Sequence, residues 1–254
     1  MSHEDNMTST LQRIKGFTII ELLLAMTFIS ALLLAIALTI VQVANIYNRG
    51  IILKEVNQTS RAISDELESS LRSSSTFSTE ADDKRYVNNQ WGGRMCLGQY
   101  SYIWNYGSAL EAVNENRNQY SGPNTSGNVV IGSNGTPRYE ISFVKVPDAG
   151  GTYCIANGQG VYPKISPTNA VELLRSGDHS LVFHSFKVDS NATSKDALSA
   201  QQLYKVTYVL GTDKLSAIKT DLTGCKAPGE TGSDLNYCAA EQFTLVLRVV
   251  SGVN

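Results

Sequence analysis

Few residues in this 254-residue chain have the types and spacing that enzymatic or metal chemistry requires. The nearest candidates are three carboxylates, Asp65, Glu66 and Glu68, and two histidines, His179 and His184. We interpret the carboxylates as a solvated helix face, and two histidines alone are too few for a closed zinc site. No phosphate-binding loop, G-x-S-x-G nucleophile motif or H-E-x-x-H zinc motif is present. We therefore expect no enzyme, and neither a metal nor a cofactor.

The cysteines offer redox chemistry instead. There are four, Cys96, Cys154, Cys225 and Cys238. Their even number suits disulfides formed in an oxidising compartment. Three pairings are open, and free buried thiols are the alternative. No C-x-x-C spacing occurs, which argues against a zinc ribbon or a thioredoxin-type motif.

One segment alternates large aromatic residues with other residues: Tyr100, Tyr102, Trp104 and Tyr106. On a strand, these four rings would share one face of the sheet. Such a face can stack the bases of single-stranded DNA, or sugars. The net charge of −2 and the lack of a basic tail argue against general nucleic-acid binding through a broad positive surface. We favour packing of the rings as core against a helix, and keep ligand binding as the alternative.

The element that must position the N-terminal residues is a long apolar helix. Residues 22–41 form a run of 20 residues without a charge, which spans roughly 30 Å as a helix, the thickness of a bilayer's hydrocarbon core. We predict a transmembrane segment over about residues 22–43. The rival, a cleaved secretory signal, has an apolar core of only about 7–15 residues and a small-residue cleavage site that this run lacks. Glu21 begins the run, and a carboxylate there needs a partner or must reach the lipid headgroups.

The residues before and after Glu21 form a motif. Residues 13–22 read RIKGFTIIEL: a short basic leader ends in Gly16, Phe17 follows, and Glu21 is the fifth residue after Gly16. Together with the apolar helix, this resembles the prepilin leader and cleavage site of type IV pilins and related pseudopilins. The resemblance covers about the first 45 residues. It implies that a membrane-embedded prepilin peptidase cuts between Gly16 and Phe17, N-methylates Phe17, and leaves Glu21 to act in subunit assembly.

Cleavage would change the charge of the new N-terminus. Before it, the Phe17 nitrogen is a neutral amide, and afterwards it is an amine that is largely cationic near neutral pH. This ammonium can pair with the Glu21 carboxylate of a neighbouring subunit. The resemblance implies three partners: other pilin subunits through the N-terminal helix, the prepilin peptidase, and the inner-membrane pilus assembly machinery. It also implies a single-pass precursor in the inner or cytoplasmic membrane that later joins a pilus at the cell surface.

The rest of the chain matches the family in general layout. We expect an α+β, pilin-like fold, in which a long N-terminal helix with a membrane half and an amphipathic half packs on an antiparallel β-sheet domain. The expected divisions are a leader over residues 1–16, a helix over 17–73 and an extracytoplasmic β domain over 74–254. Apolar residues at helical spacing predict the buried stripe of the outer half. They are Ile52, Val56, Ile63, Leu67 and Leu71.

Strands are predicted by segments rich in β-branched and aromatic residues. These segments are residues 139–146, 181–188, 203–210 and 243–250. A turn at residues 148–151 predicts that the first of them forms a hairpin with residues 152–156.

The loop between Cys225 and Cys238 resembles the C-terminal disulfide-bounded loop of many pilins. That resemblance implies a Cys225–Cys238 bond and leaves Cys96 to pair with Cys154. About 238 residues follow Gly16, which is large for a major pilin of this family. The resemblance therefore favours a minor pilin that acts in filament initiation or at the tip, in adhesion, motility or DNA uptake. The alternatives are a type II secretion pseudopilin and, in another class, a DNA- or glycan-binding module on a membrane anchor.

Overall fold

The computed structural model describes residues 17–79, 84–89, 92–110, 142–158, 162, 163, 165, 169–174, 180–190, 201–234 and 236–250. The chain divides into two compact units, and the boundary lies between Asn45 and Ile46. Each unit is described by itself.

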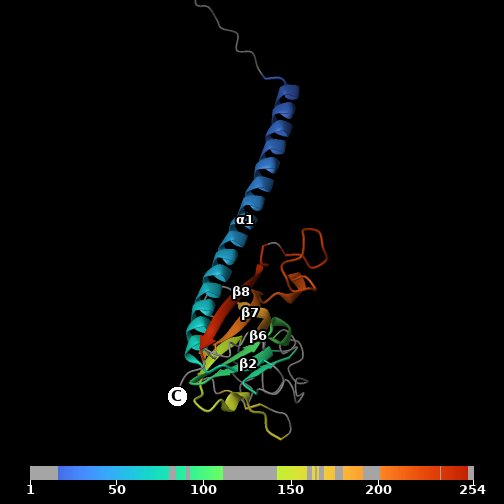
Figure 1. Cartoon of the computed structure of the whole chain (residues 1–254). Coiled ribbons are helices and arrows are strands. Elements are labelled where there is room, and N and C mark those ends of the chain that lie inside the picture. Colours follow the sequence, from blue (N-terminus) through green and yellow to red (C-terminus); the bar gives the residue numbers. More distant parts are fainter. Residues whose placement is uncertain are drawn as a thin grey trace, which may run out of the picture. The chain divides into compact units, whose positions relative to one another are not determined.

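The longest element, α1, runs from Ile19 to Ser73 (Figure 1). Its end is fixed by serines, because the hydroxyl of Ser73 donates to the carbonyl of Ser70 and that of Ser74 donates to the carbonyl of Leu71. These bonds satisfy carbonyls that a helix end leaves without partners. The prediction of a helix ending near residue 73 is confirmed. Residues 17–44 are all exposed, and α1 is long and apolar enough, by its length and composition, to cross a membrane.

The second half of α1 belongs to the unit that begins at Ile46. The predicted apolar stripe is confirmed, since all five of its residues are buried. Between them, Ser60 and Ser64 place their hydroxyls 2.8 and 2.9 Å from the hydroxyl of Tyr208 on a strand of the sheet. This half of the helix is therefore held to the sheet by an apolar stripe with polar contacts within it.

Two antiparallel sheets belong to the same unit as this half of α1 (Figure 1). The first has the strand order β1-β2-β3-β4-β5 and the second β6-β7-β8. The strands of the first are β1 (Tyr86–Asn88), β2 (Gly92–Leu97), β3 (Tyr100–Asn105), β4 (Phe143–Pro147) and β5 (Val171–Glu172). Those of the second are β6 (Leu181–Ser190), β7 (Gln201–Thr212) and β8 (Ala240–Val250). One long helix with antiparallel sheets confirms the α+β class.

One hydrophobic core joins α1 to both sheets. Aromatic rings carry much of it: Trp104 of β3 lies 4.4 Å from Phe186 of β6, and Phe143 of β4 lies 5.0 Å from Phe183 of β6, measured between ring centroids. Large rings bury more apolar area than other side chains, so they dominate the burial that holds such a core together.

The three strands β6, β7 and β8 confirm the predictions for the last three segments. β4 lies at the end of the first predicted segment, of which residues 139–141 lie outside the described residues. The predicted hairpin strand at residues 152–156 is wrong, because Thr152–Cys154 form a short 3-10 helix, η1. The carboxylate of Asp148 accepts hydrogen bonds from the backbone N–H groups of Thr152 and Tyr153 at 2.9 and 3.0 Å. Those two donors are therefore not available to a strand ladder.

Candidate functional site

The N-terminus of α1 is closed by a reciprocal pair of hydrogen bonds. The backbone N–H and the hydroxyl of Thr18 both donate to Oε2 of Glu21, at 3.0 and 2.9 Å. The backbone N–H of Glu21 donates in turn to the Thr18 hydroxyl at 3.3 Å. Since α1 begins at Ile19, Thr18 is the N-cap and Glu21 is the third helical residue, which is a capping box.

This geometry gives Glu21 a partner within its own chain. A carboxylate in the first turn of a helix also lies at the positive end of the helix dipole. Phe17 is exposed directly before this turn. Gly16 and the leader lie outside the described residues, so cleavage after Gly16 and N-methylation of Phe17 stay predictions.

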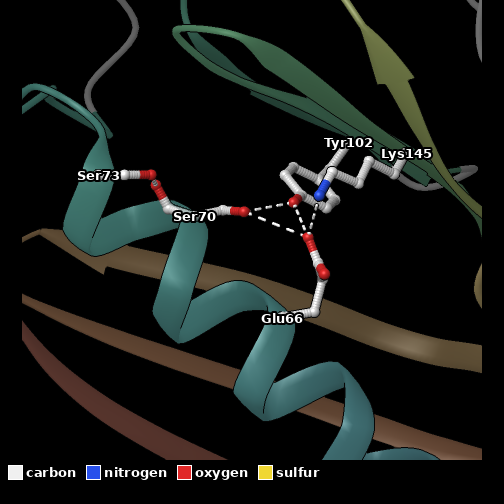
Figure 2. A network of polar contacts seen from close by, with 5 residues as sticks. All are labelled: Glu66, Ser70, Ser73, Tyr102 and Lys145. Atoms are coloured by element: carbon white, nitrogen blue, oxygen red, sulfur yellow. Dashed lines mark hydrogen bonds and ion pairs between the residues drawn. The ribbon is translucent and has the colours of Figure 1, made fainter.

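A second polar site joins the outer half of α1 to the first sheet. Figure 2 shows Glu66 pointing from α1 toward Tyr102 of β3 and Lys145 of β4. Oε1 of Glu66 accepts hydrogen bonds from the Tyr102 hydroxyl, from Nζ of Lys145 at 2.6 Å and from the Ser70 hydroxyl at 3.3 Å. The hydroxyls of Ser70 and Tyr102 lie 2.5 Å apart. Glu66 is therefore an anchor of the helix rather than a member of a fully solvated face.

The pKa values at this anchor follow from its burial and its partners. Burial by itself raises the pKa of Glu66, but hydrogen bonds from Lys145 and Tyr102 and the charge of Lys145 outweigh it, so the pKa is lowered. Burial, followed by the hydrogen bond to Glu66, raises the pKa of Tyr102. The carboxylate is thus ionised and the phenol neutral near pH 7, which is the state that these hydrogen bonds need.

The four aromatic residues of segment 100–106 do not together form an exposed stacking face. Tyr102, Trp104 and Tyr106 are buried, and only Tyr100, with 40% of its surface exposed, reaches solvent. Their rings are core because α1 and the second sheet cover them: Tyr102 contacts Ser70, and the Tyr106 hydroxyl donates to the carbonyl of Phe186 at 2.9 Å. The alternative that we favoured, packing against the helix, is the observed one.

All four cysteines are in disulfides, Cys96–Cys154 and Cys225–Cys238. The first joins β2 to the end of η1, across 58 residues, and the second closes a loop of 13 residues. In the chain-entropy description, loops of these lengths stabilise the fold by about 4 and 3 kcal/mol.

The described part of the chain contains no cluster of three or more residues that could hold a metal ion. His184 is buried in β6, and its Nε2 lies 3.1 Å from the carbonyl oxygen of Thr212. His179 lies outside the described residues. His184 is thus a core residue with one ring nitrogen hydrogen-bonded, while its buried Nδ1 has no hydrogen-bond partner among the described residues.

No protein-family model matches this chain, and neither a curated protein nor a solved structure does. The functional argument therefore depends on the residues and contacts themselves.

Thr18, Ser70 and Lys145 belong to these sites but were absent from the sequence-based predictions of site residues. Thr18 could have been found, because Thr18-x-x-Glu21 ahead of an apolar run has the spacing of a capping box. Lys145 could not, because it is 79 residues from Glu66 in the chain and only the fold brings them together.

Proposed function

We propose that this protein is a subunit of a type IV filament, of the minor-pilin kind, anchored by α1 in the membrane before assembly. The observation that carries the proposal is Glu21 in the first turn of α1, four residues after Phe17 and ahead of an exposed run without charge over residues 22–41. A membrane anchor alone needs no carboxylate there, because an ionisable residue in an apolar segment costs free energy and marks function.

The capping box explains how Glu21 is accommodated before assembly. Its carboxylate binds Thr18 within the precursor. Cleavage after Gly16 would create an ammonium at Phe17. In a packed bundle of helices, this ammonium could pair with the Glu21 carboxylate of a neighbouring subunit. An ion pair in such a low-dielectric bundle is strong, and removal of one partner leaves the other charge buried without compensation.

The outer half of α1 supports the same proposal. From Ile52 onward the helix is fastened to the sheets by its buried stripe and by Glu66. One half of α1 is bound to the sheets, and the other half is apolar. By inserting its apolar half among the helices of a filament, such a helix can bring the attached domain into the filament. The size of the chain after Gly16, about 238 residues, favours a subunit at the tip or in initiation over a shaft subunit.

The decisive experiment separates the charge of Glu21 from its capping role. Glu21→Gln keeps a capping side chain and removes the charge, whereas Thr18→Ala removes the cap and keeps the charge. We expect Glu21→Gln to lower incorporation into sheared filaments by about tenfold or more at equal membrane levels. We expect Thr18→Ala, and Asp65→Ala on an exposed part of the same helix, to incorporate nearly normally.

Quantitative mass spectrometry of sheared filaments and of membranes gives this ratio, and the intact mass of the filament subunit shows whether it begins at a methylated Phe17. Equal incorporation of Glu21→Gln and the parent chain would contradict the proposal. A defect in Thr18→Ala as large as that in Glu21→Gln would assign Glu21 to capping alone.

Pseudopilins of type II secretion systems carry the same N-terminal motif, and they are the second candidate. A strain lacking the protein distinguishes the two. Loss of twitching, adhesion or DNA uptake supports the pilus, and loss of protein secretion supports the pseudopilin.

A further inference from the structure

A polar cavity of about 450 Å³ lies where the last turns of α1 meet the β2–β3 turn and β4. We call it the serine pocket, after the five serines in its wall, Ser69, Ser70, Ser73, Ser74 and Ser75. The opposite wall contains Gln99, Tyr100 and Lys145. A cavity of this size is within the range of small-molecule sites, roughly 300–1,000 Å³.

Serine hydroxyls in this wall are oriented by the protein. Ser73 and Ser74 donate their hydroxyl protons to helix carbonyls, and Ser75 accepts a hydrogen bond from Nη1 of Arg85 at 3.0 Å. A hydroxyl that donates to the backbone still has oxygen lone pairs to offer. The wall from Ser73 to Ser74 therefore presents acceptors, which suits a ligand with several O–H groups.

The charges in the pocket are balanced. Arg72 is paired with Glu68 at 2.7 Å, and Lys145 is paired with Glu66 at 2.6 Å. An anionic ligand would have to compete with these carboxylates for both cations, and a cationic ligand would meet two positive charges at the wall. The arrangement thus favours a ligand without net charge.

The exposed aromatic ring of the pocket is Tyr100. Nζ of Lys145 lies 4.1 Å from the centroid of the ring, which fixes the ring by a cation–π contact. The side chain is 40% exposed, so it offers an apolar surface beside the amide of Gln99. Aromatic surfaces next to hydroxyl and amide groups suit molecules that have both C–H faces and polar edges.

We propose that the serine pocket binds a neutral carbohydrate. Its hydroxyls would donate to the serine oxygens, and the C–H face of a sugar ring would pack on Tyr100. A purely apolar ligand is disfavoured because the serine wall would lose water without gaining partners. The site is in the unit that begins at Ile46, so the inference goes beyond the filament proposal and does not depend on it.

The test is saturation-transfer NMR on the full chain in a detergent without a sugar headgroup. The neutral probes are lactose, maltose and chitobiose, and the anionic probes are sialyllactose and inorganic phosphate. We expect saturable binding of at least one neutral disaccharide. We expect Tyr100→Ala, and Ser69→Phe to fill the pocket, to weaken it by about tenfold or more. Tyr237→Ala, at an exposed tyrosine outside the pocket, should leave binding unchanged.

Near-UV circular dichroism of each variant shows whether the fold is kept, and the two pocket variants are at exposed positions. The proposal is overturned if no neutral probe binds, if only an anionic probe binds, or if Tyr237→Ala weakens binding as much as the pocket variants do. Filament incorporation is measured separately, so failure of one proposal is distinguishable from failure of the other.

Discussion

Among single residues, Lys145 is the counter-charge of the anchor that joins α1 to the sheet. The side chains of Lys145 and Glu66 are only 23% and 29% exposed, so solvent screens their pair weakly. Lys145→Met keeps the aliphatic stem but leaves the Glu66 carboxylate without its cation. We expect the free energy of unfolding to fall by about 1–3 kcal/mol at pH 7, measured by urea denaturation of the full chain in detergent.

The matched control is Lys187→Met, since Lys187 pairs with Asp189 where both side chains are well exposed, at 68% and 46%. It should cost about 0–1 kcal/mol. The sign of the pH dependence follows from the lowered pKa of Glu66. The stability that this group contributes is present above the ordinary carboxyl pKa and is lost as the pH falls through the folded-state pKa. An effect of Lys145→Met as large at pH 3 as at pH 7 would contradict this assignment.

The buried imidazole of His184 predicts acid sensitivity. Burial lowers the pKa of His184 to about 4, although the hydrogen bond with Thr212 opposes this. Between that value and its ordinary pKa near 6.5, the unfolded chain binds a proton that the folded chain does not bind. The free energy of unfolding should therefore decrease, by up to about 1.4 kcal/mol per pH unit, as the pH falls from about 6.5 to 4. For His184→Gln, denaturation curves at pH 6.5, 5.5 and 4.5 should give a free energy of unfolding that falls less steeply with decreasing pH. An unchanged pH dependence would mean that other groups cause the acid sensitivity.

At the scale of elements, local patterns were sufficient for α1 and for the three long strands of the second sheet. Each of these segments keeps its hydrophobic periodicity over many residues, so the secondary structure that it predicts does not depend on any one long-range contact. β2 was not among the predicted strands, and it begins with two glycines, Gly92 and Gly93. In the fold, a Cβ at Gly93 would lie 2.3 Å from the Trp104 ring, so this glycine makes room for the indole inside a strand.

The candidate site could be predicted from the sequence only where its parts are near in the chain. Gly16, Phe17 and Glu21 lie within six residues, so the resemblance that suggests their roles can be recognised in one short segment. The serine pocket is lined by α1 and by a turn and a strand that lie further along the chain. No local sequence pattern predicts that these elements lie together. The same limit affected the β3 aromatics, because alternation shows which rings share a face but not what covers that face.

The two halves of α1 should respond differently to the same substitution. Leu67 is fully buried in the core, whereas Leu33 is exposed in the apolar half. We expect Leu67→Ala to lower the free energy of unfolding of the unit that begins at Ile46 by about 2–5 kcal/mol, because it removes packed atoms and leaves a cavity. Leu33→Ala should leave that free energy unchanged. Near-UV circular dichroism during urea denaturation measures both, and equal effects would contradict the division of the helix.

At the scale of the whole molecule, the chain is poor in charge. Charged residues make up 17% of it, against about 25% in ordinary soluble domains. The apolar run explains only part of this deficit, because the chain from residue 49 onward is still only about 19% charged. Neutral polar residues take the place of ions in this part of the chain. Such a surface suits a protein that packs beside copies or partners, since like charges would repel one another at short range.

The division at Ile46 predicts that the unit beginning there folds without the apolar half of α1. The described core residues begin at Ile52, and residues 17–44 are all exposed. Deletion of residues 1–45 should therefore give a soluble protein with both disulfides and an unchanged thermal midpoint, compared with the full chain in the same detergent. Near-UV circular dichroism measures the midpoint, and a fall of more than about 4 °C, or about 1 kcal/mol, would mean that the deleted half contributes to the fold. The truncated protein should also stay out of membranes and filaments, because it keeps the buried stripe but lacks Phe17, Glu21 and the apolar run.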